Sequence, residues 1–228
     1  WSSDVCSSDL VDHPIVFVSQ HALPDSVGYE AHIHATGEVP SRDNLHDFFN
    51  ALMWLHFPRI KRSLNQLHVT EIDRLQYQSI QPPQRGFRGK QRDAATLFDE
   101  NAALFISSDS SLIAALRQHD WRTLLQKDPD RFSTNVNVIL FGHALLEKLI
   151  SPYKAITAHV WCIEATAEWL LRTPVQQLSW LDDLLAPAIA RGFTSADLGH
   201  LPVLGVPGWW PGQDQDFYAD ASVFRRPR

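Results

Sequence analysis

The sequence predicts an α+β fold, in which one helix-rich domain contains a small mixed β-sheet. Three observations lead to this prediction. Several segments repeat apolar residues at the three- and four-residue spacing of helices that are buried on one side. Short apolar or alternating runs, which are typical of strands, lie between them. The chain has 228 residues, of which 44% are hydrophobic, and no Gly/Ser-rich linker divides it, so a single core is the simplest organisation.

The composition argues against binding of nucleic acids and membranes. The formal net charge is -6 and the sequence pI is about 6.0, whereas proteins that bind nucleic acids or anionic membranes carry a broad basic surface. No apolar run approaches the roughly 18 residues that span a bilayer. We therefore expect a soluble protein with no nucleic-acid partner and no membrane partner.

Residues 1–10, WSSDVCSSDL, resemble a translated sequencing-adapter scar of the kind found in assembled metagenomic sequences. They show no usable periodicity, and the only methionine of the chain is Met53. We therefore exclude them and expect residues 11–228 to form a single domain that lacks its native N-terminus. With Cys6 set aside, Cys162 has no partner for an internal disulfide, which favours a reducing compartment and a cytoplasmic location.

Five short segments have the composition of strands. They are Ile15–Ser19, Tyr29–Ala35, Ala102–Ser107, Asn137–Phe141 and Thr157–Ile163. We expect the first two to form a hairpin across QHALPDSVG. On the second strand Glu30, His32 and His34 would then share one face, and His-x-His on a strand is a spacing that metal sites use. A face that simply meets solvent explains the same alternation.

The segment Leu45–Phe57 is predicted to be a central helix, with Asn44 as its N-cap. Its expected core-facing residues are Leu45, Phe48, Phe49, Leu52, Leu55 and His56. On another side, at about 100° per residue, lie His46, Asp47 and Asn50, followed by Met53, Trp54 and Phe57. A helix that is apolar nearly all round is expected to be buried, so its polar cluster must be hydrogen-bonded, bound to metal or open to a cleft.

A capping box offers a simpler explanation for part of this cluster. Asn44 and Asp47 have the spacing of such a box, and an acidic residue in the first turn suits the helix dipole. Asn50 could bond to the backbone. The cap does not account for His46 and Asn50 lying one turn apart.

Pro58 is expected to end the central helix and to begin a second helix that runs to about Tyr77. Its predicted buried positions are Ile60, Leu64, Leu67, Ile72 and Leu75. The loop SIQPPQRGFRGKQR follows, and it contains Arg85, Arg88, Lys90 and Arg92. These side chains suit a phosphate or a carboxylate, and they equally suit an ordinary solvated loop.

The next predicted helix, Arg92–Asn101, ends in three polar residues. Its inward positions are Ala94, Ala95, Leu97 and Phe98, and another side carries Arg92, Thr96 and Asp99. Asp99, Glu100 and Asn101 then form either a helix end with its turn or the edge of a site. The dipole at a helix C-terminus disfavours adjacent carboxylates, so we expect a compensating group.

A helix is also predicted to begin at His143, after Gly142 and a buried strand. His143 and Glu147 lie one turn apart, a spacing that metal ligands share with ordinary stabilising pairs. The strand, glycine and helix N-terminus could also bind an anion. Further helices are expected at Ser110–His119 and Val175–Arg191, the latter closed by Gly192.

The C-terminal tail, from Leu201 to Arg228, is rich in Pro, Gly and Trp and is predicted to be extended. Aromatic side chains of this bulk are rarely left in water. They either cover the domain core or, in the case of Trp209 and Trp210, line a ligand cleft or a partner surface.

Five blocks of the sequence, RDNLHDFFNALMWLHFP, RDAATLFDENAAL, FGHALLEKL, LPVLGVPGWWP and FYADASVFR, resemble the bacterial family catalogued as domain of unknown function 3025. The resemblance runs from about Ile15 to Arg226. It implies kinship and no particular reaction, cofactor or catalytic residue. His32 and His34 lie outside the five blocks, which weakens the hypothesis of a metal site on a strand.

Our first functional hypothesis is an enzyme, most simply a hydrolase. Its catalytic residues would be His46, Asp47, Asp99, Glu100 and His143, with Asn50, Asn101 and Arg92 positioning the carboxylates and the substrate. Histidines and carboxylates can hold a divalent metal that activates water, and here the candidate ligands are His46, Asp47, His143 and Glu147. The same groups can act as general acid and base without a metal.

The second hypothesis is a non-catalytic module that binds a small ligand or a protein through Trp209, Trp210 and the basic loop. The third is purely structural, with every polar cluster buried and satisfied. The sequence contains no Gly-rich phosphate loop, Cys pair motif or Gly-x-Ser-x-Gly elbow that would distinguish them.

Overall fold

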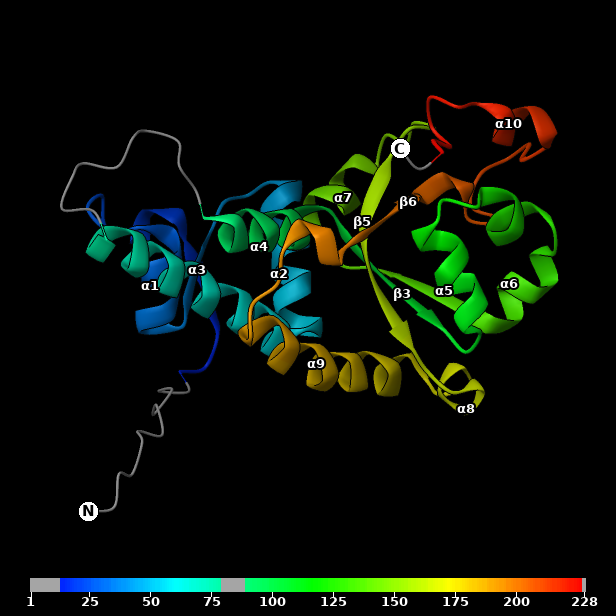
Figure 1. Ribbon diagram of the computed structural model, residues 1–228. Helices are drawn as coiled ribbons and strands as arrows, with labels where there is room; N and C mark the ends of the chain where they lie inside the picture. Colours follow the sequence, from blue (N-terminus) through cyan, green and yellow to red (C-terminus); the bar gives the residue numbers. More distant parts are fainter. Residues whose placement is uncertain (1–12, 79–88, 227–228) are drawn as a thin grey trace, which may run out of the picture.

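A four-stranded mixed sheet lies in the middle of the molecule (Figure 1). The computed structural model describes residues 13–78 and 89–226. The strand order is β4-β3-β5-β6, formed by Val136–Leu140, Ala102–Ser107, Thr157–Glu164 and Gly199–Pro202. β3 pairs parallel with β5, and the two outer strands pair antiparallel with their neighbours. This mixture of helices and strands confirms the predicted α+β class.

Two hydrophobic clusters cover the two faces of this sheet. All six residues of β3 are buried, and they alternate between the faces. Leu104 and Ile106 pack in one cluster with residues of α3 (Pro58–Gln78), α4 (Lys90–Asn101) and α9 (Pro174–Ala190). Phe105 packs in the other with residues of α5 (Ser110–Arg117) and α6 (Pro129–Asn135). Figure 1 shows these two sets of helices on opposite sides of the sheet.

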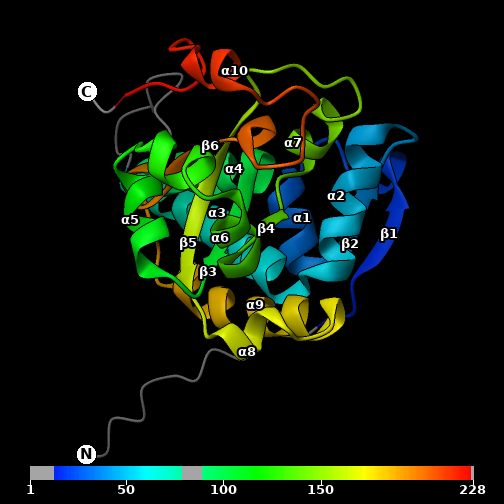
Figure 2. The ribbon, with the colours of Figure 1, turned by 90° about the vertical axis from the view of Figure 1, so that its right-hand side faces the viewer.

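A second, two-stranded sheet lies at the edge of the molecule, beside α1 and α2 (Figure 2). Its parallel strands are β1 (Val16–Ser19) and β2 (Glu38–Ser41). The remaining elements are α1 (Tyr29–Thr36), α2 (Leu45–His56), α7 (His143–Lys148), α8 (Ala167–Leu170), α10 (Gln215–Ala219), the short 3-10 turns Gln20–Ala22, Ser195–Asp197 and Val203–Gly205, and the π-helical turn Arg122–Gln126. In the part of the chain described here, no helix is both long and apolar enough to span a membrane.

The predicted strand Tyr29–Ala35, and with it the hairpin, is wrong, because this segment forms helix α1. Gly37 ends the helix with a φ of 75°, and its N–H donates to the carbonyl of Ile33. A glycine in this left-handed conformation commonly ends a helix. Gly37 is therefore the sequence feature that favours a helix over the strand predicted from alternating apolar and polar residues. On a helix His32 and His34 point to different sides: His32 is buried with Nε2 3.2 Å from Glu38, and His34 is exposed. They do not form a ligand pair.

The predicted bounds of α2 and α3 are confirmed, but the predicted buried side of α2 is wrong. Asn44 caps α2 by accepting the Asp47 N–H at 2.8 Å, and α3 begins at Pro58. However, Leu45, Phe48 and Leu55, which were expected in the core, are 50%, 55% and 66% exposed. The buried side instead contains Asp47, Met53 and Trp54. Periodicity does not choose the buried side of a helix that is apolar nearly all round.

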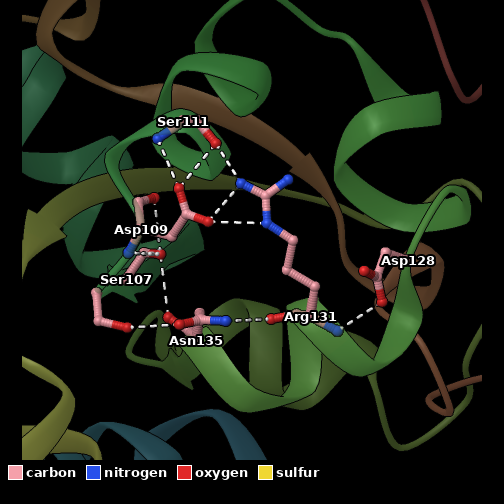
Figure 3. Close-up of polar contacts among 7 residues, drawn as sticks. Ser107, Asp109, Ser111, Asp128, Arg131 and Asn135 are labelled. Carbon is pink, nitrogen blue, oxygen red and sulfur yellow. Dashed lines mark hydrogen bonds and ion pairs between the residues drawn. The ribbon is translucent and has the colours of Figure 1, made fainter.

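A polar network joins the end of β3 to α5 and α6 (Figure 3). The Asp109 carboxylate caps α5 by accepting the Ser111 N–H at 3.0 Å, and it also accepts from Arg131 of α6. The buried Ser107 hydroxyl lies 3.0 Å from the Asn135 carbonyl oxygen. This network accounts for the start of α5 directly after the sheet.

The predicted strands of the larger sheet, the end of α9 and the C-terminal tail agree with the structure to different degrees. The strands Ala102–Ser107, Asn137–Phe141 and Thr157–Ile163 are confirmed to within one residue as β3, β4 and β5, and α9 ends before Gly192, whose φ is 87°. The tail is not wholly irregular, since it contains part of β6 and α10, and Phe217 and Phe224 are buried in the second cluster. Residues 1–12, Arg85 and Arg88 lie outside the described residues, as does the side chain of Leu75.

Candidate functional site

A cavity of about 880 Å³ lies among α1, α2, α3 and α4, with α7 at one end. Seven of the predicted site residues line it: His46, Asp47, Asn50, Arg92, Asp99, Glu100 and His143. The structure adds polar residues that were not predicted as site residues: Tyr29, Glu30, Arg42, Lys61, Asn65, His68, Asp73 and Thr96. The cavity therefore unites polar groups from helices that are distant in sequence.

Lys61 and Asp99 form an ion pair in the wall of this cavity. The Lys61 side chain is 4% exposed, and Nζ donates to Asp99 Oδ1 at 2.5 Å and to Asn50 Oδ1 at 2.9 Å. Nζ also lies 5.4 Å from the ring centroid of Trp54, which is a cation-π contact. Lys61 is the group that compensates Asp99 at the end of α4, as expected from the adjacent carboxylates. Nothing in the spacing of α3 singled it out.

Two histidines meet at the α7 end of the cavity. The Nε2 atoms of His46 and His143 are 3.1 Å apart, and their rings meet edge to face. His46 Nδ1 lies 2.9 Å from Glu147 Oε2, so Nδ1 carries the proton that this contact needs. The backbone of Asp99 acts on the His143 imidazole as a hydrogen-bond partner. His143 Nδ1 is buried and lies 3.9 Å from Asp99 Oδ2. That separation is too long for a hydrogen bond, but it is short enough for a carboxylate to attract an imidazolium.

Gly142 allows the close approach that brings His143 to Asp99. A Cβ at this position would lie 2.6 Å from the backbone of both Asn101 and Ala102, and closer still to the carbonyl oxygen of Glu100. Only a residue without a side chain therefore fits between α7 and the junction of α4 with β3. The position of the histidine thus depends on backbone packing.

The surroundings at the α7 end of the cavity change the pKa of Asp99 and of His143. Burial alone would raise the pKa of Asp99, but the charge of Lys61, aided by His143, outweighs burial and lowers it. Burial lowers the pKa of His143, Lys61 and His46 act in the same direction, and Asp99 opposes them. At neutral pH this end therefore contains an ionised Asp99 and a neutral His143, which is able to accept a proton.

The middle of the cavity contains a phenol and an amide. Asn50 Nδ2 donates to the Tyr29 hydroxyl oxygen at 3.2 Å. Burial raises the pKa of Tyr29, and the negative charges of Glu30 and Asp99 add to this effect. Tyr29 is therefore a neutral phenol, and its own O–H has no acceptor among the described residues.

The four candidate metal ligands are not arranged around one point. The Asp47 carboxylate accepts three hydrogen bonds from Arg42, at 2.7 to 3.0 Å. Although burial acts to raise the pKa of Asp47, these bonds lower it. The expected alternative, a pair between His143 and Glu147, is wrong, because Glu147 contacts His46. Within residues 13–78 and 89–226, no group of three or more His, Cys, Asp or Glu side chains is placed to hold a metal ion.

Three other predicted site residues lie away from the cavity wall. Asn101 accepts a hydrogen bond from Lys148 at 2.6 Å, on the outer side of the α4 end. Trp209 is 39% exposed in the C-terminal segment, and Trp210 packs against the second hydrophobic cluster. Neither tryptophan lines the cavity.

The comparison with protein families matches the resemblance seen in the sequence. Residues 15–228 match the family described as "Protein of unknown function (DUF3025)". Since the match covers nearly the whole chain, the protein belongs to this family. No curated protein and no solved structure matches the chain.

Proposed function

We propose that this member of the DUF3025 family is a hydrolase whose general acid and base are the paired histidines His46 and His143. The observation that carries the proposal is the contact of the two histidines beside Asp99: their Nε2 atoms are 3.1 Å apart, and the buried Nδ1 of His143 lies 3.9 Å from Asp99 Oδ2. An imidazole beside a carboxylate gains stability when it takes up a proton, and this is the property that a general base needs.

In the proposed reaction the histidine pair accepts a proton from water as the water oxygen attacks a carbonyl or phosphoryl centre. Asp99 stabilises the imidazolium that forms on His143, and Lys61 keeps Asp99 ionised. The bond to the leaving group then breaks, and the histidine pair returns the proton to that group. A neutral Tyr29 hydroxyl can donate a hydrogen bond to the oxygen that gains charge.

The main competing interpretation is that the polar cluster is structural. A structural cluster is expected to satisfy its buried polar atoms, because each unsatisfied atom costs roughly 1 to 3 kcal/mol. Among the described residues, His68 Nδ1 in this cavity has no hydrogen-bond partner, but the same holds for buried nitrogens of His32, His119 and Trp169 outside it. What favours a site over a structural cluster is that polar groups from several helices surround an open cavity of about 880 Å³, which a substrate could fill.

Hydrolysis of a panel of p-nitrophenyl esters and p-nitrophenyl phosphate would test the proposal. We expect His143→Ala and His46→Ala to lower kcat by about 100-fold or more, because general acid and base catalysis contributes at least this factor. His56→Ala is the matched control, since His56 is an exposed histidine of the same helix as His46 that does not line the cavity. Folded histidine variants that hydrolyse every substrate at the wild-type rate would refute the proposal.

The pH profile and a chelator add two readouts to this test. Since burial lowers the pKa of His143, the base stays neutral as the pH falls through 6.5, and kcat/KM should decline only at lower pH. Because the candidate ligands are not gathered around one point, we expect EDTA to leave the rate unchanged. A rate that EDTA abolishes and Zn²⁺ or Mn²⁺ restores would replace this mechanism with the metal-dependent alternative.

We also propose a cytoplasmic location. The support for it is that Cys162 is free and is the only cysteine in the described part of the chain.

A further inference from the structure

The end of the cavity away from the histidine pair contains two groups that lack partners. Arg92 lines the cavity, and its guanidinium forms no hydrogen bond or ion pair with the described residues. His68 is 6% exposed, and its Nδ1 is buried without a hydrogen-bond partner. The guanidinium is a donor, and a neutral imidazole has one donor nitrogen and one acceptor nitrogen, so a ligand could bind both groups in this cavity.

The two helices that form the cavity floor set the distance between its ends. α3 contributes Lys61 at one end and His68 at the other, and α4 contributes Asp99 and Arg92 in the same order. Each pair is separated by seven residues of helix, which corresponds to about 10 Å at 1.5 Å per residue. Along the helix axes, the backbone positions of Arg92 and His68 therefore lie about 10 Å from those of Asp99 and Lys61.

We infer that the substrate is elongated and carries an anionic group, a carboxylate or a phosphate, that binds Arg92 and His68 about 10 Å from the bond that reacts. This inference rests on the proposed hydrolase function for the position of the reacting bond. Arg92 supplies the charge and the fork of N–H donors that such anions bind best, and His68 supplies one further N–H.

The other groups at this end are consistent with an anion there. Glu30 is occupied by Asn65, whose Nδ2 donates to Glu30 Oε2 at 2.6 Å and to its carbonyl oxygen at 2.9 Å. Asp73 is exposed at the cavity rim. Burial lowers the pKa of His68, Glu30 and Asp99 oppose this, and Arg92 and Lys61 add to it. A neutral His68 donates through one nitrogen only, so Arg92 is expected to dominate the binding.

Aliphatic side chains also line the cavity. Leu64 lies on α3 between Lys61 and His68 and is 2% exposed, Ile72 lies one turn beyond His68, and Ile33 comes from α1. An aliphatic linker between the anionic group and the reacting bond would bury apolar surface against them. The substrate class is therefore an anionic ester, or another hydrolysable derivative, with an apolar segment in its middle.

Calorimetric titration with octanoate, octyl phosphate and octanamide tests the anion site without any need for catalysis. We expect one of the two anions to bind at least tenfold more tightly than the neutral octanamide, and the stronger anion identifies the carboxylate or the phosphate class. Arg92→Met should lower the affinity for that anion at least tenfold. Arg172→Met, at an exposed arginine outside the cavity, should change it less than twofold. Equal binding of octanamide, or an unchanged affinity in Arg92→Met, overturns the inference.

Hydrolysis of p-nitrophenyl monoesters of linear dicarboxylic acids separates this inference from the proposed function. Arg92→Met should raise KM for these anionic substrates at least tenfold more than it raises KM for their neutral methyl esters. His143→Ala should lower kcat for both sets and leave anion binding within twofold. Anion binding that depends on Arg92 without any hydrolysis would refute the hydrolase and keep the anion site. Hydrolysis of the anionic substrates at an unchanged rate and KM in Arg92→Met would refute the anion site and keep the hydrolase.

Discussion

Lys61 and Asp99 illustrate how single residues support the site. Neither charge would be stable alone in this environment, since moving an unpaired ion out of water costs several kcal/mol. Their contact at 2.5 Å, together with Asn50, lets both remain charged next to the histidine pair. The pair thus keeps a negative charge beside His143.

We expect the losses caused by removing Lys61 and by removing Asp99 not to be additive. Asp99→Asn and Lys61→Met should each lower the free energy of unfolding by about 3 kcal/mol, because a buried charge remains unpaired. The double variant should lose less than the sum of the two losses. Urea unfolding measures these values. The control is Asp183→Asn, which breaks the exposed pair with Arg59 and should cost at most about 1 kcal/mol. Additive losses at Lys61 and Asp99 would contradict this account.

His159 gives a prediction about stability and pH. Burial, together with the neighbouring His200 and Lys148, lowers its pKa to about 4. From pH 6.5 to about 4 the unfolded chain therefore binds a proton that folded His159 does not, so stability is complete above pH 6.5 and decreases as the pH falls. The decrease in Tm between pH 7 and pH 4.5 should be smaller in His159→Gln by about 2 °C or more. The exposed His34→Gln should behave like the wild type, and equal decreases in all three proteins would contradict the argument.

At the scale of single elements, the position of α7 is fixed by close backbone packing. This helix has only six residues, yet it carries His143 and Glu147 and packs on both α2 and α4. Its first residue follows Gly142 directly, so the backbone of the glycine decides where the imidazole lies. The candidate site therefore depends on the junction between β4 and α7 as much as on its own side chains.

Gly142→Ala should displace α7 and the histidine pair with it. The new Cβ meets backbone atoms that have no freedom to move aside, so we expect a loss of about 1 to 3 kcal/mol in stability and a larger fall in hydrolytic rate. Urea unfolding and the p-nitrophenyl assay measure the two effects. Gly28→Ala is the control, because a Cβ there meets nothing within 4 Å. Wild-type stability in Gly142→Ala would show that the junction can relax.

At the scale of the whole molecule, the sheet divides the core into two clusters that share the same strands. Phe98 belongs to the cluster on the cavity side, and Phe105 belongs to the cluster on the other side. Since adjacent residues of β3 alternate between the clusters, neither cluster can unfold while the strand keeps all its contacts. The two faces are therefore expected to unfold together.

Phe98→Ala and Phe105→Ala test this coupling. Both side chains are fully buried, so each truncation should cost about 3 to 5 kcal/mol. In calorimetry each variant should show one transition at a lower Tm, in agreement with a single domain over residues 11–228. A second transition in either variant, with the other part unchanged, would indicate two independently folding units.

From the sequence alone we predicted the class of fold, the approximate bounds of the central helices and of three strands of the larger sheet, and seven of the residues that line the cavity. The buried run Ala102–Ser107 and the spacing of His46 with Asn50 are local patterns, and strong local patterns of this kind predict the backbone structure of a segment. The same rules failed at Tyr29–Ala35, because a short alternating run fits a helix or a strand, and only packing selects one.

Only the tertiary structure decided which groups meet. Lys61 contacts Asp99, and His46 contacts His143, across helices that lie far apart in the sequence. Arg92, in contrast, has no hydrogen-bond or ion-pair partner among residues 13–78 and 89–226. The exposed side of α2 was decided in the same way, since an apolar helix buries whichever side its neighbours cover. Spacing along a chain sets the direction of a side chain, but contact energies between elements set its partner, and those energies depend on the complete fold.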